Sequence, residues 1–489
     1  MTTLAILTCS ILAFATQQLK LHMMAEEEEL SLDQLSLKDV EREEEQAIIQ
    51  DIQKEEPILD IDRPGHLNNL SPEQRQKLLD LWTLVIANLS SPSLHKGTEA
   101  ATLKENKELV KTLQENNQST SSLSSQERSE IMQRHPASSE FWSQLSTDHP
   151  DVLLLRFLRA RKWSVPDAFS MFHETAKWRS RYGVRDILQK GDARLKKQIF
   201  EKGEGFFFGL DRHKRVVTYL VSRLHNRNAQ TLDETCQYTV YQMEIGRRLF
   251  QPGSETVTMV FDLSNAPLSS LDFSSVQFMI QCFQNYYPES LGRCLIYNAP
   301  WIFWGFYKII KPLLDPVVVE KIIFIEDAQH LHTFIEPDQL LEEYGGNCPY
   351  KYEYLPPPSS SSLSSPASSA SSDKPSSTST SLASSSQLSL EGAVSVTSSI
   401  PPNGPVQVSE LEMEELNKQL EATKTRFIDE TMLLIQEDSQ DNRDRREKTL
   451  SELRAIFKRL DKHYLPENHY HRLGVIQPDD SVVWPSNKS

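Results

Sequence analysis

Residues 191–355 alternate between short apolar runs, rich in β-branched and aromatic residues, and longer segments with helical periodicity. The predicted strands cover residues 215–221, 256–263, 293–298 and 321–325. The predicted helices between them cover residues 232–250, 273–286 and 302–314. Strands that alternate with helices and are apolar on both faces form a largely parallel sheet covered by helices. The pattern therefore predicts an α/β lobe.

Helical segments dominate the chain before this lobe. The first predicted helix begins at Ser71-Pro72, which combines a serine N-cap with proline at the first helical position. Two more helices are predicted at 151–163 and 165–182. We place an N-terminal helical domain at 63–190, with a polar insertion at 90–139, and the lobe at 191–355.

The composition of the flanks differs from that of the two domains. Residues 1–62 are acidic with little apolar periodicity, and residues 356–408 are rich in serine, so neither segment can bury a core. We expect a disordered N-terminus and a flexible linker. Residues 409–465 are predicted to be helical and 466–489 to form a tail. The helices suit a surface or self-pairing hairpin, and a partner-binding helix is the alternative.

The chain begins with an apolar run from Leu4 to Ala15. No positive segment precedes it, as a signal peptide would require, and it is too short to span a bilayer. Met23-Met24 would serve as an ordinary cytosolic start. We expect residues 1–22 to be an upstream extension without a targeting role, and a signal or anchor is the alternative.

Charge and motifs exclude several classes of function. The net charge of −16 argues against a nucleic-acid binder, which needs a basic face. The five cysteines form no CxxC pair and no histidine cluster has zinc spacing, so we expect reduced thiols in a cytosolic protein and no metal. The sequence contains no nucleophile elbow, phosphate loop or HExxH motif. We therefore expect no catalytic residues and no enzymatic activity.

The segment 301–310 is apolar and aromatic around nearly its whole circumference, whereas a surface helix is apolar along one stripe. One interpretation is a buried core helix. The other is a mobile helix that lines a lipid cavity on one side and meets a membrane on the other, an interface that suits tryptophan and tyrosine. The residues of this candidate gate and acyl-chain pocket are Trp301, Phe303, Trp304, Phe306 and Ile310.

Several motifs, in family order across residues 141–354, make this part of the chain resemble the CRAL-TRIO lipid-binding family, in particular its fungal phosphatidylinositol-transfer branch. They are Leu154-Leu155-Arg156-Phe157-Leu158-Arg159-Ala160-Arg161-Lys162-Trp163, Asn285-Tyr286-Tyr287-Pro288-Glu289, Asn298-Ala299-Pro300 and Lys311-Pro312-Leu313-Leu314-Asp315-Pro316. The resemblance implies a helical bundle packed on an α/β lobe. It also implies one large apolar pocket that holds a single lipid beneath a gating helix.

The resemblance also implies a head-group site. In phosphatidylinositol-binding members of the family an arginine, a glutamate and a lysine bind the head group, and the motifs align these positions with Arg161, Glu289 and Lys321. Each residue has a plainer interpretation: a surface charge on its helix, the cap of a turn, and an exposed residue at a strand start.

The chain departs from the family pattern near these positions. Val318 stands in place of a threonine, and Ser290 in place of an arginine. Val257 and Met259 replace the hydroxyl residues that would hold the phosphate of a choline lipid. These departures count against phosphatidylcholine, weaken phosphatidylinositol binding, and favour a more apolar ligand such as a sterol or an isoprenoid.

The sequence and the resemblance together predict a phosphatidylinositol carrier that exchanges one lipid between membranes or presents it to lipid kinases. The bound phospholipid is then the ligand, with no cofactor. We expect a cytoplasmic monomer that transiently touches endoplasmic reticulum, Golgi or endosomal membranes and binds no nucleic acid. A protein partner could bind the C-terminal helices. The alternatives are a carrier of a neutral apolar ligand and a non-catalytic regulatory module.

Overall fold

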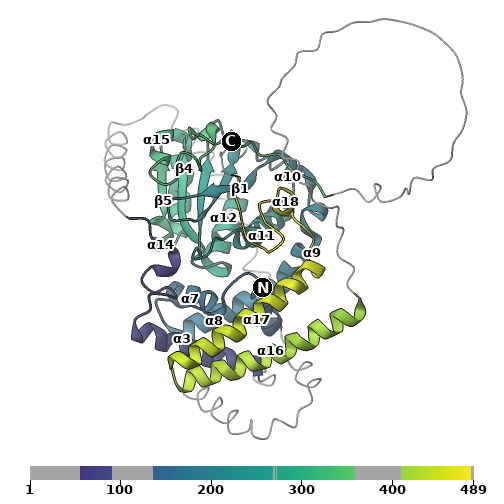
Figure 1. The fold of residues 1–489 in the computed structure, drawn as a ribbon. Helices are drawn as coiled ribbons and strands as arrows, with labels where there is room; N and C mark the ends of the chain where they lie inside the picture. Colours follow the sequence, from purple (N-terminus) through teal and green to yellow (C-terminus); the bar gives the residue numbers. More distant parts are fainter. Residues whose placement is uncertain (1–55, 91–135, 268–269, 271, 358–408, 486–489) are drawn as a thin grey trace, which may run out of the picture.

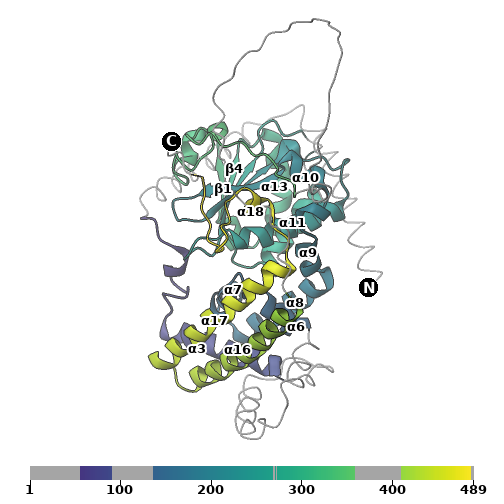
Figure 2. The same cartoon turned by 45° about the vertical axis from the view of Figure 1, so that its right-hand side comes forward.

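The computed structural model of the protein describes residues 56–90, 136–267, 270, 272–357 and 409–485 (Figure 1). An α/β lobe and a helical unit lie side by side in it (Figures 1 and 2), and each has its own core of buried apolar side chains. The predicted extension at 1–22, and most of the insertion and the serine-rich linker, lie outside the described residues.

The lobe is built on a five-stranded sheet in the order β1-β2-β3-β4-β5. The strands are β1 (Gly205–Leu210), β2 (Val216–Val221), β3 (Val257–Asp262), β4 (Leu291–Tyr297) and β5 (Ile322–Ile325). Strands β2 to β5 run parallel, and β1 pairs with β2 in the antiparallel direction. The mostly parallel sheet confirms the predicted fold class.

Among the strands of the described ranges, sequence reasoning missed β1. Its three phenylalanines show no alternation of apolar and polar residues. The strand is buried on both faces, which explains the continuous apolar run. Gly209 has a φ of 71° and lies where the pairing with β2 shifts register.

Three helices lie over the same face of the sheet. Helix α11 (Leu232–Arg248) begins with a capping box formed by Thr231 and Glu234. Helix α12 (Phe273–Gln281) continues into a π-helical turn (Cys282–Tyr286). Helix α13 (Trp301–Ile310) follows β4. The remaining helices of the lobe are α9 (Val184–Arg194), α10 (Lys197–Lys202), α14 (Pro316–Val319), α15 (Ala328–Leu331) and α18 (His469–Arg472).

The helical unit combines both ends of the described chain. It contains α3 (Pro72–Ser90), α6 (Pro136–Ser143), α7 (Pro150–Ala160), α8 (Val165–Tyr182), α16 (Glu410–Gln436) and α17 (Gln440–Tyr464). Helices α16 and α17 pair as a hairpin, one of the two predicted arrangements. Their apolar side chains also enter the core of the N-terminal helices, which the sequence did not predict: the ring of Phe427 lies 5.8 Å from that of Trp82.

One buried ion pair joins the C-terminal hairpin to α7. The Arg446 guanidinium donates two hydrogen bonds, of 2.7 and 2.8 Å, to the Asp151 carboxylate, and the Trp82 indole donates a third of 2.6 Å. The guanidinium also lies over the rings of Trp82 and Phe427, 4.9 and 4.8 Å from their centroids. Burial raises the pKa of Asp151, but Arg446 outweighs burial and holds it at about 2.

Two segments predicted to lie outside the domains belong to the fold. Residues 56–62 were predicted to be disordered, yet Asp60 is buried and accepts hydrogen bonds of 2.9 and 3.0 Å from the Arg215 side chain. In the predicted tail, the Tyr470 hydroxyl accepts a 2.7 Å hydrogen bond from the backbone N–H of Phe207 in β1. Both contacts join residues more than 150 positions apart in sequence, so local composition could not reveal them.

Candidate functional site

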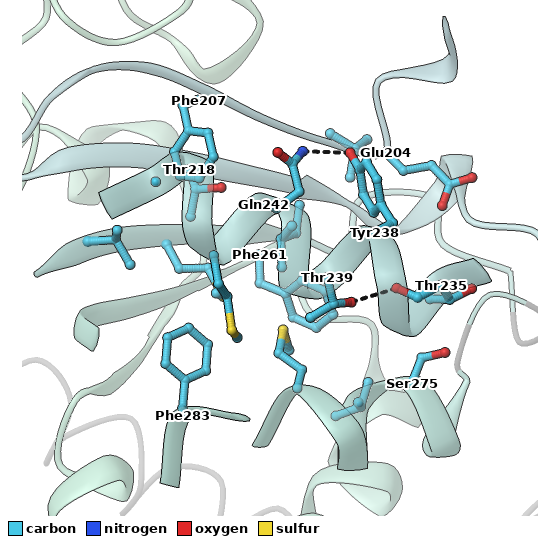
Figure 3. Close-up of a pocket in the computed structure, with 18 of the residues that line it drawn as sticks. Glu204, Phe207, Thr218, Thr235, Tyr238, Thr239, Gln242, Phe261, Ser275 and Phe283 are labelled. Atoms are coloured by element: carbon cyan, nitrogen blue, oxygen red, sulfur yellow. Dashed lines mark hydrogen bonds between the residues drawn. The ribbon is translucent and has the colours of Figure 1, made fainter. Parts of the chain in front are cut away.

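A large cavity lies between the sheet and helices α11 and α12 (Figure 3). Its empty volume is about 1130 Å³, which includes some space open to solvent. Most of its wall is apolar.

Two neighbouring strands form the floor of the cavity. Thr218 and Leu220 of β2 pair in register with Met259 and Phe261 of β3. Because side chains alternate along a strand, these four residues point to the same face of the sheet, and all four line the cavity. Val257 also lines it, so the two apolar residues that replace the expected phosphate-binding hydroxyls lie in the cavity wall.

Helix α11 forms much of the opposite wall, which sequence reasoning did not identify. Thr235, Thr239 and Met243 stand four residues apart, on one face of the helix, and all line the cavity. Tyr238 and Gln242 donate hydrogen bonds of 2.6 Å each to the backbone carbonyl of Gly205 and so fix the helix against β1. The signal that could have revealed this wall is the four-residue spacing of small polar side chains on a helix predicted to cover a sheet.

The candidate gate residues on α13 lie beside the cavity rather than in its wall. Phe303, Phe306 and Ile310 are buried. The ring of Phe303 lies 6.5 Å from Phe261, which does line the cavity, and 6.4 Å from Phe324 of β5. Trp301 and Trp304 belong to α13, but their side chains lie outside the described part of the structure. The structure therefore places the helix next to the cavity and leaves its gating role a prediction.

The structure brings together two of the three predicted head-group residues. The Lys321 ammonium lies 3.5 Å from the Glu289 carboxylate, and the two side chains are 22% and 25% exposed. Glu289 has a φ of 53°, a left-handed conformation that is strained for a residue other than glycine. Such strain clusters at ligand-binding sites.

The third head-group residue, Arg161, follows the end of α7 and is half-buried. Among the described residues no carboxylate pairs with it, and its guanidinium donates a 3.1 Å hydrogen bond to the carbonyl of Ala160. Two other arginines of α7 have structural partners: Arg156 donates to the carbonyl of Glu255 and Arg159 to its carboxylate, both at 2.9 Å. Among the described residues no hydrogen bond or ion pair joins Arg161 to Glu289 or Lys321, so its head-group role stays a prediction.

The head-group pair adjoins one end of the cavity. Tyr287 and Ser290 flank Glu289 in the chain, and both line the cavity. The Ser290 hydroxyl donates a 2.5 Å hydrogen bond to the carbonyl of Tyr287 and closes the turn that holds Glu289. Lys321 directly precedes β5, so the pair lies at the amino-terminal edge of the parallel strands.

The chain thus combines a helical unit with an α/β lobe whose sheet forms the floor of an apolar cavity. Residues 200–346 match the family model described as CRAL/TRIO domain, and residues 105–174 match the one described as CRAL/TRIO, N-terminal domain. The chain belongs to the CRAL-TRIO family, as the sequence motifs predicted.

Relatives from fungi match a little under half of this chain. CRAL-TRIO domain-containing protein C3H8.02 of Schizosaccharomyces pombe is 43% identical over 222 residues, 44% of this chain and 50% of the relative. Phosphatidylinositol transfer protein CSR1 of Eremothecium gossypii is 38% identical, over 46% of this chain and 53% of the relative. Sec14 cytosolic factor of S. pombe is 30% identical, over 40% of this chain and 75% of the relative. The chain thus spans about half the length of the first two.

Proposed function

We propose that the protein binds one phosphatidylinositol molecule and carries it between membranes or presents it to lipid kinases. The observation that supports this most directly is the apolar cavity of about 1130 Å³ that adjoins the Glu289–Lys321 pair. Two acyl chains contain about 30 CH₂ groups, and exposing them to water costs on the order of 20 kcal/mol. A carrier must therefore enclose both chains, and this cavity is the place to do so.

The polar pair supplies chemistry that suits the head group. A phosphodiester held near an apolar cavity needs positive partners, because an unpaired charge there is costly. Lys321 and Arg161 can supply positive charge, and the Glu289 carboxylate can accept hydrogen bonds from inositol hydroxyls. Ser290 and Val318 are shorter or less polar than the residues that the family resemblance implies, so we expect fewer head-group contacts than in a full family site.

The relatives and the surface support the same proposal. One relative, 38% identical over 46% of this chain, is named a phosphatidylinositol transfer protein. Leu313 and Val317, just after α13, are 45% and 43% exposed and lie near the exposed Lys308 and Lys311 in the chain. Apolar side chains beside lysines suit contact with an anionic membrane. We place this carrier in the cytosol, in transient contact with endoplasmic reticulum, Golgi or endosomal membranes, and its task involves no catalytic step.

No helix in the described ranges has both the length and the hydropathy that crossing a membrane requires.

A neutral apolar ligand, such as a sterol or an isoprenoid, is the second candidate. Among the described residues that line the cavity, Arg247 and His225 are the only basic side chains. Arg247 already forms ion pairs with Asp148 and Glu244, and His225 pairs with Glu204. The interior of the cavity therefore offers no spare cation to a phosphate, and this favours an uncharged ligand.

Removing both members of the head-group pair tests the first candidate. We expect the double variant Glu289→Ala with Lys321→Ala to lose at least ten-fold in transfer of labelled phosphatidylinositol between liposomes. The matched control is Glu174→Ala with Lys177→Ala, which removes an exposed ion pair of 2.8 Å on α8 and should leave transfer unchanged. Circular dichroism should show both variants folded. Wild-type transfer by the folded head-group variant would refute the assignment of these residues.

A further inference from the structure

The end of the cavity at the carboxyl-terminal edge of the sheet carries two carboxylates and a histidine. Glu204 precedes β1, His225 follows the short turn after β2, and Asp272 caps α12; all three line the cavity. Figure 3 shows Glu204 on one side of the cavity and the rings of Phe207 and Phe283 on the other. This polar end is opposite the one that adjoins the head-group pair.

The histidine lies between the two carboxylates. Its Nδ1 is 3.1 Å from Glu204 Oε2, and its Nε2 is 3.7 Å from Asp272 Oδ2. Asp272 and Glu204 raise the pKa of His225 to about 9, and His225 holds the pKa of Asp272 at about 2. At neutral pH the ring is therefore a cation and both of its nitrogens are donors. Within the described ranges no group of three or more His, Cys, Asp and Glu side chains could hold a metal ion.

Packing explains only part of this cluster. Asp272 caps α12, and Glu204 Oε2 also accepts a 3.2 Å hydrogen bond from Gln230. Glu204 Oε1 and His225 Nε2 are buried, and in the described part of the chain they have no hydrogen-bond partner. The Lys202 ammonium lies 3.6 Å from Glu204 Oε1, too far for a hydrogen bond. Glu204 is 8% exposed, and a buried polar atom left unpaired costs about 1–3 kcal/mol.

We propose that Glu204 and His225 form a subsite for the hydroxyl group of a neutral lipid alcohol held in the cavity. A hydroxyl is both donor and acceptor, so it can donate to Glu204 Oε1 and accept from His225 Nε2, two buried atoms that have ion-pair neighbours at 3.6 and 3.7 Å but no hydrogen bond within the described ranges. The apolar body of the ligand then lies against Met259 and Phe261.

The subsite rests on the proposed use of the cavity as a lipid site and gives the second candidate ligand a chemical class. The carboxylates of Glu204 and Asp272 repel a phosphate, so a phospholipid head group belongs at the opposite end, beside Glu289 and Lys321. A lipid alcohol and a phospholipid would then approach the cavity with their polar groups at opposite ends and exclude each other.

The test compares pairs of lipids that share one apolar body and of which only one member has the free hydroxyl group. The full-length protein is equilibrated with liposomes that contain cholesterol or cholest-4-en-3-one, and separately dioleoylglycerol or its 3-acetyl ester. Bound lipid is then counted by native mass spectrometry. We expect at least one alcohol to bind about tenfold more tightly than its partner, the effect of roughly one buried hydrogen bond. The lipid pair that shows the preference also indicates whether the cavity accepts a rigid sterol body or a flexible diacyl body.

Variants then assign the preference to the cluster. Glu204→Gln and, independently, His225→Leu should bring the ratio close to one. Glu201→Gln, an exposed carboxylate on the neighbouring α10, should keep the wild-type ratio. Equal binding in both lipid pairs by wild-type protein, or an unchanged ratio in a folded Glu204→Gln variant, would overturn the subsite.

The two proposals fail separately. Phosphatidylinositol transfer by wild-type protein is measured alongside. If wild-type protein prefers the alcohol but does not transfer phosphatidylinositol, the result counts against the proposed function alone. Transfer without any hydroxyl preference counts against the subsite alone.

Discussion

Two ion pairs in the molecule each join one basic and one acidic side chain, but they differ in burial and geometry. Arg446 and Asp151 form two short hydrogen bonds in a buried site, with side chains 4% and 11% exposed. Lys321 and Glu289 are 3.5 Å apart, their side chains are 22% and 25% exposed, and the backbone of Glu289 is strained. The first pair joins two helices that are distant in sequence, whereas the second borders a cavity.

The difference separates structural charge from charge available to a ligand. Loss of one partner of a buried pair with good geometry strongly destabilises the fold, because the remaining charge stays buried with neither a partner nor water to compensate it. A half-exposed pair with a long separation contributes little to stability, and its atoms can change partners at small cost. By this criterion Glu289 and Lys321 meet the requirement of the proposed head-group site, and Asp151 and Arg446 do not.

Arg446→Ala should produce the largest change in stability. It leaves the Asp151 carboxylate buried without its guanidinium, so we expect a loss of about 3–5 kcal/mol in the free energy of unfolding. Urea denaturation followed by circular dichroism measures this. Arg445→Ala, which removes an exposed pair with Asp441 on the same helix, should cost less than about 1 kcal/mol. A small effect at Arg446 would remove the contrast between the two pairs.

Acid should weaken the buried pair in a defined range of pH. The pKa of Asp151 is about 2 in the fold, against an ordinary value of 3.8, so its contribution to stability is complete above pH 4. That contribution, about 2 kcal/mol, is lost as the pH falls from 4 to 2. The urea midpoint of wild-type protein should therefore fall more steeply over this range than that of Arg446→Ala. Parallel curves would show that the pair does not control acid stability.

Glu289→Gly should have the smallest effect on stability and the opposite sign. Glycine adopts a φ of 53° without steric cost, so relief of strain should stabilise the fold by about 0.5 kcal/mol. The same change removes the head-group carboxylate and should lower phosphatidylinositol transfer. Glu320→Gly, at an exposed position with a φ of −63°, should not stabilise the protein. If Glu289→Gly destabilises the protein, the Glu289–Lys321 pair contributes to stability, against this account.

Local sequence patterns predicted most helices and strands of this fold but few of the contacts between residues that are distant in sequence. Helix α8 has the predicted bounds of 165–182, and the four parallel strands lie within a residue or two of their predicted ranges. Apolar periodicity and β-branched runs determine these elements. The places of Asp60 and Tyr470 depend on partners far away in the chain, which no local pattern encodes.

The candidate site divides in the same way. Glu289 and Lys321 could be predicted because each lies in or beside a motif, at an end of a predicted strand. Glu204, His225 and Asp272 come from three separate loops, each with an ordinary sequence, and only the packing of α11 and α12 over the sheet brings them together. Sequence alone also assigned the pocket wall to α13, whereas the described wall is formed largely by α11, α12, β2 and β3.

Native mass spectrometry of the purified full-length protein tests the central claim most directly, namely that the cavity over β2 and β3 holds one lipid. The account predicts one copurified lipid per chain in wild-type protein and in Leu232→Trp, a change at an exposed position of α11. It predicts no lipid in Thr239→Trp, which fills the cavity from the same helix. A lipid-free wild-type protein, or a folded Thr239→Trp variant with its lipid still bound, would contradict it.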